Sequence, residues 1–139
     1  MSKPRSKRSP FLDRVKKADC KVEVLYFITP KGKCPAEDDF LNKPKIVPKS
    51  KKTQLAALIL RYAREGEIIN DERCHRLKGR VRDFWVFKHF QHRLYFFKEG
   101  TSRIVITHGL VKKDDELERQ EEDRMLSMRD TYKDITLYK

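Results

Sequence analysis

The sequence predicts an α+β fold in which a strand and two helices precede three consecutive strands and a last helix, the order β-α-α-β-β-β-α. A β-branched and aromatic run over residues 21–29 predicts the first strand. Apolar residues recur at helical spacing over residues 50–65, and Gly66 follows as a terminator. Three runs rich in aromatic and aliphatic residues, 82–89, 92–98 and 103–108, then follow one another across short connections, which predicts three neighbouring strands.

The remaining elements follow from local signals. Pro35 suits a first helical turn, and the acidic residues after it predict a short helix through residue 41. Residues 68–79 are polar and basic, which predicts a connecting loop. Residues 114–129 predict a charged helix, because an acidic first turn suits the helix dipole. The apolar face of the 50–65 helix consists of Leu55, Leu58, Ile59 and Tyr62.

The chain is long enough for one domain, with a charged arm at its start. We expect residues 1–19 to be a disordered basic arm, because they have little to bury, residues 20–133 to form the domain, and residues 134–139 to be a tail. The net charge is +12, and residues 1–52 alone carry +9. Such an excess favours a polyanionic partner, most simply a nucleic acid, through counterion release.

Several classes of protein are disfavoured by what the sequence lacks. No apolar run is long enough for a membrane helix and no signal peptide is evident, so we expect a soluble, cytoplasmic protein without a membrane partner. The three cysteines, Cys20, Cys34 and Cys74, form no paired motif and are expected to be free thiols. The spacing of histidines and cysteines fits no standard metal site, and no Gly-rich phosphate loop is present, so no metal or other cofactor is predicted.

The predicted strands bring two cations together. A short connection between residues 89 and 92 places Lys88 opposite Arg93, and the same treatment of the next turn pairs Tyr95 with Ile104. Like charges on facing positions repel, so an anion such as a phosphate between Lys88 and Arg93 would relieve the conflict, unless both side chains simply splay into water. The face that they share is expected to contain Val86, Lys88, Arg93, Tyr95, Ile104, Ile106 and His108.

The opposite face is expected to pack on the helix over residues 50–65. Its members are Trp85, Phe87, Leu94, Phe96 and Val105. The sheet would then be covered on one side and partly open on the other. A concave basic surface with aromatic walls suits single-stranded RNA, because bases stack on exposed rings while Lys and Arg hold phosphates.

Several motifs in order resemble a known family. They are Tyr26-Phe27, Leu77-Lys78-Gly79, Tyr95-Phe96-Phe97 and, most specifically, a strand that ends in Ile106-Thr107-His108-Gly109-Leu110-Val111-Lys112-Lys113 before a helix. Over about residues 21–130 the chain resembles the phage-derived HigB-like branch of the RelE/ParE toxin superfamily, whose members belong to type II toxin-antitoxin systems. The resemblance implies a small twisted antiparallel sheet.

The resemblance also implies a function. Such toxins are metal-independent endoribonucleases that cleave mRNA, often on the ribosome, inhibit translation and are neutralised by a co-encoded helix-turn-helix antitoxin. By position, their basic residues correspond to Lys78, Lys88, Arg93, Lys112 and Lys113, and an aromatic after the last helix corresponds to Tyr132. Two departures are Lys88, where many relatives have arginine, and the acidic segment 114–116, where relatives commonly have Thr and Pro.

Cleavage by in-line attack of the RNA 2′-hydroxyl assigns roles to these residues. We expect Arg93 and Lys112 to stabilise charge on the phosphate, and Lys88 or His108 to transfer protons. His108 could instead serve structure by hydrogen bonding backbone. The expected RNA-binding residues are Lys78, Lys113, Tyr95 and Tyr132.

Two other functions remain open at this point. One is a ParE-like toxin that binds a protein target such as gyrase without cutting RNA. The other is a basic nucleic-acid-binding module without catalysis, carried by the N-terminal arm and the Lys-rich segment over residues 43–52.

Overall fold

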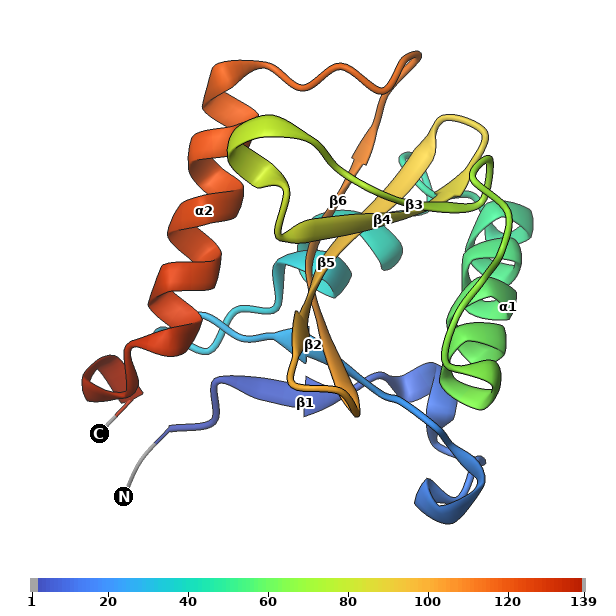
Figure 1. Ribbon diagram of the computed structural model, residues 1–139, viewed down its shortest axis with the longest axis horizontal. Helices are drawn as coiled ribbons and strands as arrows, with labels where there is room; N and C mark the ends of the chain where they lie inside the picture. The colour runs from blue at the N-terminus through green and yellow to red at the C-terminus, as the bar shows by residue number, and fades with distance from the viewer. Residues whose placement is uncertain (1–2, 139) are drawn as a thin grey trace.

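The computed structural model describes residues 3–138 and contains one six-stranded sheet between two helices (Figure 1). The strand order across the sheet is β1-β2-β6-β5-β4-β3. The α+β class predicted from the sequence is therefore confirmed. The strands are β1 (Ser6–Arg8), β2 (Glu23–Phe27), β3 (Cys74–Arg76), β4 (Phe84–His89), β5 (His92–Glu99) and β6 (Arg103–Val111), and the helices are a single π-helical turn η3 (Glu37–Leu41), α1 (Lys49–Glu65) and α2 (Arg119–Lys133).

The sheet is mixed, and the expectation of a wholly antiparallel sheet is wrong at one position. β2 runs parallel to β6, whereas every other neighbouring pair is antiparallel. A parallel pair needs a long crossover connection. Here the chain between β2 and β6 forms η3, α1 and the strands β3, β4 and β5 before β6 returns beside β2.

The N-terminal residues that the structure describes are built into the fold, contrary to the expected disordered arm. β1 pairs with β2, and Arg8 donates to the Glu23 carboxylate and to the carbonyl oxygens of Leu12 and Val15. Near the other end, a short 3-10 turn buries Tyr138, whose hydroxyl donates to the Ile28 carbonyl oxygen at 3.0 Å. The two ends of the described chain consequently lie near each other (Figure 1).

The helix α1 covers one face of the sheet, as its apolar pattern predicts. Leu55, Ile59 and Tyr62 are buried there, and the Tyr62 ring meets Phe87 and Phe96 edge-on at centroid distances of 5.4 and 5.5 Å. The helix ends at Gly66, which adopts a left-handed φ of 82° that glycine accommodates without strain.

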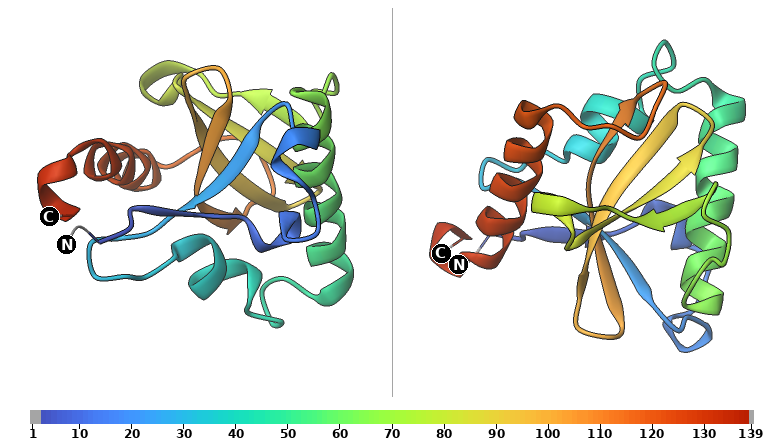
Figure 2. Two further views of the ribbon diagram at one scale, coloured as in Figure 1. Left: turned by 90° about the horizontal axis from the view of Figure 1, so that it is seen from below. Right: turned by 45° about the horizontal axis from the view of Figure 1, so that its top comes forward.

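The helix α2 covers the opposite face, which was expected to be partly open. Figure 2 shows α1 and α2 on opposite sides of the sheet. Beneath α2 lies a second core whose buried members include Phe27, Phe84, Val86, Tyr95, Phe97, Val105, Met125, Met128 and Tyr132. α2 begins at Arg119, later than predicted, because Glu118 and Glu121 form the capping box that starts it. Residues 112–118 are therefore a connection rather than a helical turn.

The pairing of β4 with β5 follows the predicted register, whereas that of β5 with β6 does not. Tyr95 pairs with His108 rather than with Ile104, because the turn lies over residues 100–102 and a bulge follows at Thr107. Ile104 and Ile106 consequently join the α1 core, and Val105 joins the α2 core, the reverse of the expected faces. The bulge returns His108 to the face of Tyr95.

Residues 68–79, expected to be a loop, contribute the edge strand β3 beside β4. None of the helices within residues 3–138 is long and apolar enough to cross a membrane.

Candidate functional site

Lys88 and Arg93 stand directly opposite each other on β4 and β5, as the sequence predicts. Both side chains are largely buried at the end of the sheet, with exposed fractions of 13% for Lys88 and 6% for Arg93. Two buried cations this close require a counter-anion, because burial removes the water that would otherwise screen their repulsion.

The protein supplies that anion itself. Asp115, in the connection between β6 and α2, accepts hydrogen bonds from Lys88 Nζ at 3.0 and 3.3 Å and forms an ion pair with Arg93. Partial burial acts to raise the pKa of Asp115, but the hydrogen bonds from Arg93 and Lys88 outweigh it and lower the pKa to about 2. The carboxylate is therefore charged at neutral pH and sits where an RNA phosphate oxygen was expected.

The Arg93 guanidinium is incompletely satisfied by this arrangement. Its Nε atom is buried and lacks a hydrogen-bond partner within the described part of the chain. A buried donor without an acceptor costs free energy, so the site holds a charged group that Asp115 alone does not fully satisfy.

Lys112 and Lys113 follow β6 and differ in their surroundings. Lys112 Nζ lies 2.5 Å from a Glu121 carboxylate oxygen, and both side chains are mostly buried. Lys113 is exposed. Lys112 is thus neutralised by the first turn of α2, whereas Lys113 faces solvent.

His108 has a structural position. It is 2% exposed, its ring stacks on Tyr95 at a centroid distance of 5.1 Å, and Nδ1 lies 2.8 Å from the Thr107 hydroxyl. Burial, with a smaller effect of the Arg124 charge, lowers the pKa of His108 to about 3. A neutral, inaccessible imidazole does not fit the expected role in proton transfer.

The glycine after His108 has a packing role. A Cβ atom at Gly109 would lie 2.1 Å from Cδ2 of Phe40, so the Phe40 ring occupies the place of a side chain. The His108-Gly109 pair, the most specific part of the sequence motif, is therefore explained by packing on both sides of the sheet end.

The two tyrosines expected to stack on bases are buried. Tyr95 is 2% exposed and Tyr132 is 3% exposed. Tyr132 packs edge-on against Phe97, and the Arg5 guanidinium lies 4.8 Å from its ring centroid. Because α2 covers this face, neither ring is available to an RNA base, and the stacking role is corrected for both.

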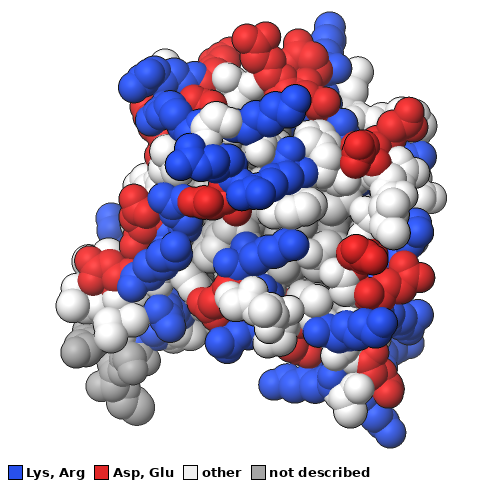
Figure 3. Space-filling view, in the orientation of Figure 1, with Lys and Arg blue, Asp and Glu red and all other residues white. Residues whose placement is uncertain are grey.

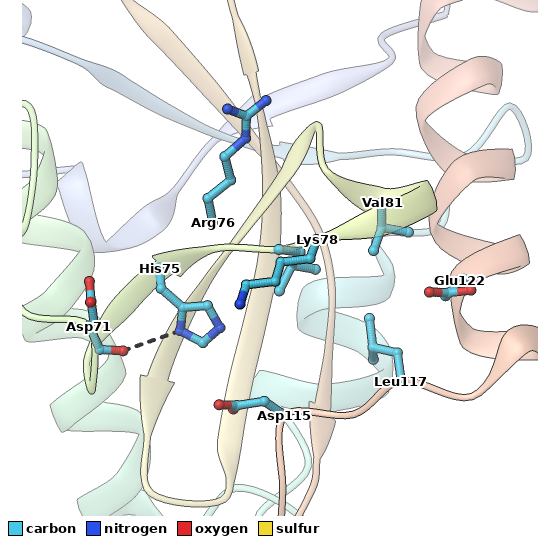
Figure 4. Close-up of a pocket in the computed structure, with 9 residues that line it drawn as sticks. Asp71, His75, Arg76, Lys78, Val81, Asp115, Leu117 and Glu122 are labelled. Carbon is cyan, nitrogen blue, oxygen red and sulfur yellow. Dashed lines mark hydrogen bonds between the residues drawn. The ribbon is translucent and has the colours of Figure 1, made fainter.

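A cavity of about 560 Å³ opens beside Asp115, between β3 and the start of α2. Its lining residues are Asp71, His75, Arg76, Leu77, Lys78, Val81, Asp115, Leu117 and Glu122. Figure 4 shows that His75 and Lys78 extend into the space that Asp115 borders. His75 Nδ1 lies 3.2 Å from the Asp71 carbonyl oxygen, which orients the ring.

His75 was not among the catalytic or RNA-binding residues predicted from the sequence. It lies in β3, and the polar composition of residues 68–79 had predicted a loop there. Lys78, exposed at the end of β3, was expected at the site and lines this cavity together with Asp115. Lys88 and Arg93 thus contact Asp115, and Lys78 lines the cavity beside it. Tyr132 packs elsewhere, against Phe97.

Charge is distributed unevenly around this site. In the view of Figure 3, Lys and Arg side chains are prominent across the middle of the face, with acidic side chains mostly towards its margins. Among residues 3–138, no three His, Cys, Asp or Glu side chains are grouped so that they could hold a metal ion.

No protein-family model matches the chain, and no curated protein matches it.

Proposed function

We propose that the chain is a toxin of the HigB-like branch of the RelE/ParE superfamily that binds and cleaves mRNA without a metal ion and so inhibits translation. The observation that carries the proposal is the convergence of Lys88 and Arg93 on one carboxylate. Carboxylate and phosphate oxygens accept the same charge-assisted hydrogen bonds, so a site built for one suits the other. The proposed partners are mRNA, on the ribosome, and a co-encoded helix-turn-helix antitoxin.

Binding of RNA in this proposal displaces Asp115. Its side chain is 56% exposed and belongs to a connection outside the regular elements, whereas Lys88 and Arg93 are fixed on paired strands. The anion is therefore the exchangeable part of the site. A phosphate with more oxygen atoms would also offer acceptors to a guanidinium that Asp115 satisfies incompletely.

Cleavage in this site follows an in-line course. The 2′-oxygen attacks the adjacent phosphorus, the bond from phosphorus to the 5′-oxygen breaks, and the products are a 2′,3′-cyclic phosphate and a 5′-hydroxyl. The reaction needs a base for the 2′-proton, cations for the crowded phosphate and an acid for the leaving oxygen.

The two cations that contact Asp115 and the residues that line the cavity divide these tasks. Arg93 and Lys88 stabilise the phosphate charge, and His75, which lines the cavity that Asp115 borders, takes up the 2′-proton. Lys78, exposed on the same cavity, supplies a proton to the leaving oxygen or holds the next phosphate. Lys113 contributes a further phosphate contact, and His108 takes no part.

One observation favours a second function, RNA binding without catalysis. Lys88, Arg93 and Lys112 are all paired with carboxylates, and His108 is buried. A protein with these pairs can exchange carboxylate for phosphate without performing chemistry.

Expression of the chain followed by mapping of mRNA 5′ ends separates these functions. New discrete 5′ ends that disappear with Lys88→Ala and with His75→Gln, and persist with the exposed control Lys31→Gln, would support cleavage at this site. RNA binding without new ends would leave only the binding module. Growth arrest with unchanged mRNA would overturn the RNA proposal and favour a ParE-like protein target.

A further inference from the structure

Phe90 is placed at the tip of the turn between β4 and β5 against two physical preferences. Its side chain is 67% exposed, and its φ of 55° lies in the left-handed region. Among the residues from 3 to 138 it is the one non-glycine with positive φ. A bulky side chain is disfavoured in this conformation, and an apolar ring gains nothing from contact with water. An exposed aromatic ring in this backbone conformation is a candidate position for binding.

Two cations lie against the ring. Lys51 Nζ is 5.2 Å and Arg73 Cζ is 5.3 Å from the ring centroid, both within cation–π distance. Lys51 belongs to the first turn of α1, which contains no acidic residue. Arg73 immediately precedes β3. The ring is therefore embedded in positive charge from two separate elements.

These cations differ from those around Asp115. Over the described range 3–138, neither Lys51 nor Arg73 forms a salt bridge with a carboxylate, whereas Lys88, Arg93 and Lys112 all do. An incoming phosphate at Lys51 or Arg73 has no internal anion to displace. The surface around Phe90 is thus the more open of the two basic sites.

His89 completes the aromatic surface. Its ring meets Phe90 edge-on at 4.8 Å, and its Nδ1 lies 3.4 Å from an Arg73 guanidinium nitrogen. Burial, followed by the charges of Lys51 and Arg73, lowers the pKa of His89. Both effects favour the neutral imidazole, whose Nδ1 can accept a hydrogen bond from Arg73.

We propose that Phe90 is a stacking position for an unpaired base of single-stranded RNA, with Lys51 and Arg73 binding the adjacent phosphates. Exposed aromatic rings among cations are how proteins bind single strands without strong sequence preference. The net charge of +12 complements a polyanion. This inference rests on the proposed RNA-binding function and gives it the exposed ring that Tyr95 and Tyr132 do not provide.

The position of Phe90 connects it to the site at Asp115. Lys88 lies two residues before Phe90, which is in the turn that directly follows β4. The Lys88 backbone N–H also donates to the Arg73 carbonyl oxygen at 2.7 Å. In this proposal one RNA strand contacts both Phe90 and the site of Lys88 and Arg93.

A binding experiment with a short oligouridine carrying 2′-O-methyl groups tests the proposal, because blocking the attacking hydroxyl prevents cleavage. Phe90→Asn removes the ring but suits a left-handed φ, so the variant is expected to fold at least as stably as the wild type. It should bind the oligonucleotide at least about fivefold more weakly, the lower end of the measured effect of losing one stacked base. Ile69→Asn, at another exposed apolar position, should bind as the wild type does.

A second variant detects stacking directly. Phe90→Trp should retain affinity, and the emission of the introduced indole should be quenched by the oligonucleotide. The wild type, whose single tryptophan is Trp85, supplies the background. Equal affinity of Phe90→Asn and wild type, or an introduced indole whose emission the oligonucleotide leaves unquenched, would overturn the inference and assign the ring to another class of partner.

The outcome is separable from that of the proposed function. Cleavage that depends on Lys88, together with unchanged binding by Phe90→Asn, would overturn the stacking position alone. Weakened binding by Phe90→Asn in a protein that produces no new mRNA ends would overturn cleavage alone.

Discussion

Arg93 and Asp115 form an ion pair with a strongly asymmetric environment, because the guanidinium is 6% exposed and the carboxylate is 56% exposed. An arginine keeps its charge even when buried, so the site must always contain an anion. The Asp115 carboxylate itself lies at the surface, in a connection that belongs to no helix or strand. This asymmetry is what makes the internal carboxylate replaceable by a phosphate.

Replacing Asp115 should weaken the dependence of stability on acid pH. The pKa of about 2 lies below the ordinary 3.8, so the charged form adds stability above pH 4 that is lost as the pH falls from about 4 to about 2. Solvent screening of this half-exposed group limits the contribution to about 1 kcal/mol. Urea unfolding near pH 5 and near pH 2 should show a smaller change for Asp115→Asn than for wild type or for the neighbouring control Asp114→Asn. An equal change in all three proteins would mean that the ion pair is not stabilising.

The buried His108 predicts a second pH dependence at higher pH. Its folded pKa of about 3 lies below the ordinary 6.5, so the unfolded chain binds the proton first. Stability is fully present above pH 6.5 and falls as the pH drops towards 3, by up to about 1.4 kcal/mol per pH unit. His108→Phe, which keeps a flat ring against Tyr95, should remove that decline in denaturant titrations between about pH 6.5 and 4. RNA cleavage should not depend on His108. The same decline of stability in the variant would contradict the prediction, because it would show that His108 is protonated in the folded protein.

The contact between Gly109 and Phe40 predicts a specific packing defect. Gly109→Ala would place Cβ 2.1 Å from the buried Phe40 ring and should destabilise the protein by about 3 kcal/mol, the upper part of the range for overpacking. Gly79→Ala, where nothing lies within 4 Å of the new Cβ, should cost only about 1 kcal/mol from its left-handed φ. Phe40→Leu should recover part of the loss in the Gly109→Ala background. Equal costs for the two alanines, measured by denaturant unfolding, would contradict the packing role of the motif.

The sequence was most informative where structure is local. The two-residue turn at 90–91 determines the register of β4 and β5, so the Lys88 and Arg93 pairing was predicted correctly. The bounds of the helix over residues 50–65 were predicted to within one residue, because the spacing of its apolar residues and Gly66 at its end are both visible in the sequence.

The register of β6 and the existence of β3 depend on features that a short stretch of sequence does not contain. The three-residue turn and the bulge at Thr107 together set which face Ile104 and Ile106 share, and both residues join the α1 core. No residue type near Thr107 indicates a bulge. β3 is an edge strand of three residues whose exposed side chains resemble a loop.

The anion at the site could not be predicted either. Asp115 is 22 residues from Arg93 and 27 from Lys88, and its acidic neighbours fit a helix start equally well. Only the later beginning of α2, set by the Glu118 capping box, leaves Asp115 free to reach the two cations.

We propose that Lys88 and Arg93 bind an RNA phosphate in place of Asp115, and a double-mutant cycle measures this exchange. The dissociation constant for the 2′-O-methyl oligouridine is measured for wild type, Asp115→Asn, Lys88→Gln and the double variant, with Glu116→Gln as a charge-matched control. We expect Asp115→Asn to bind several-fold more tightly than Glu116→Gln, and Lys88→Gln to abolish most of this gain in affinity. A gain of the same size with and without Lys88 would show that Asp115 acts only through net charge, and the phosphate site at Lys88 and Arg93 would be contradicted.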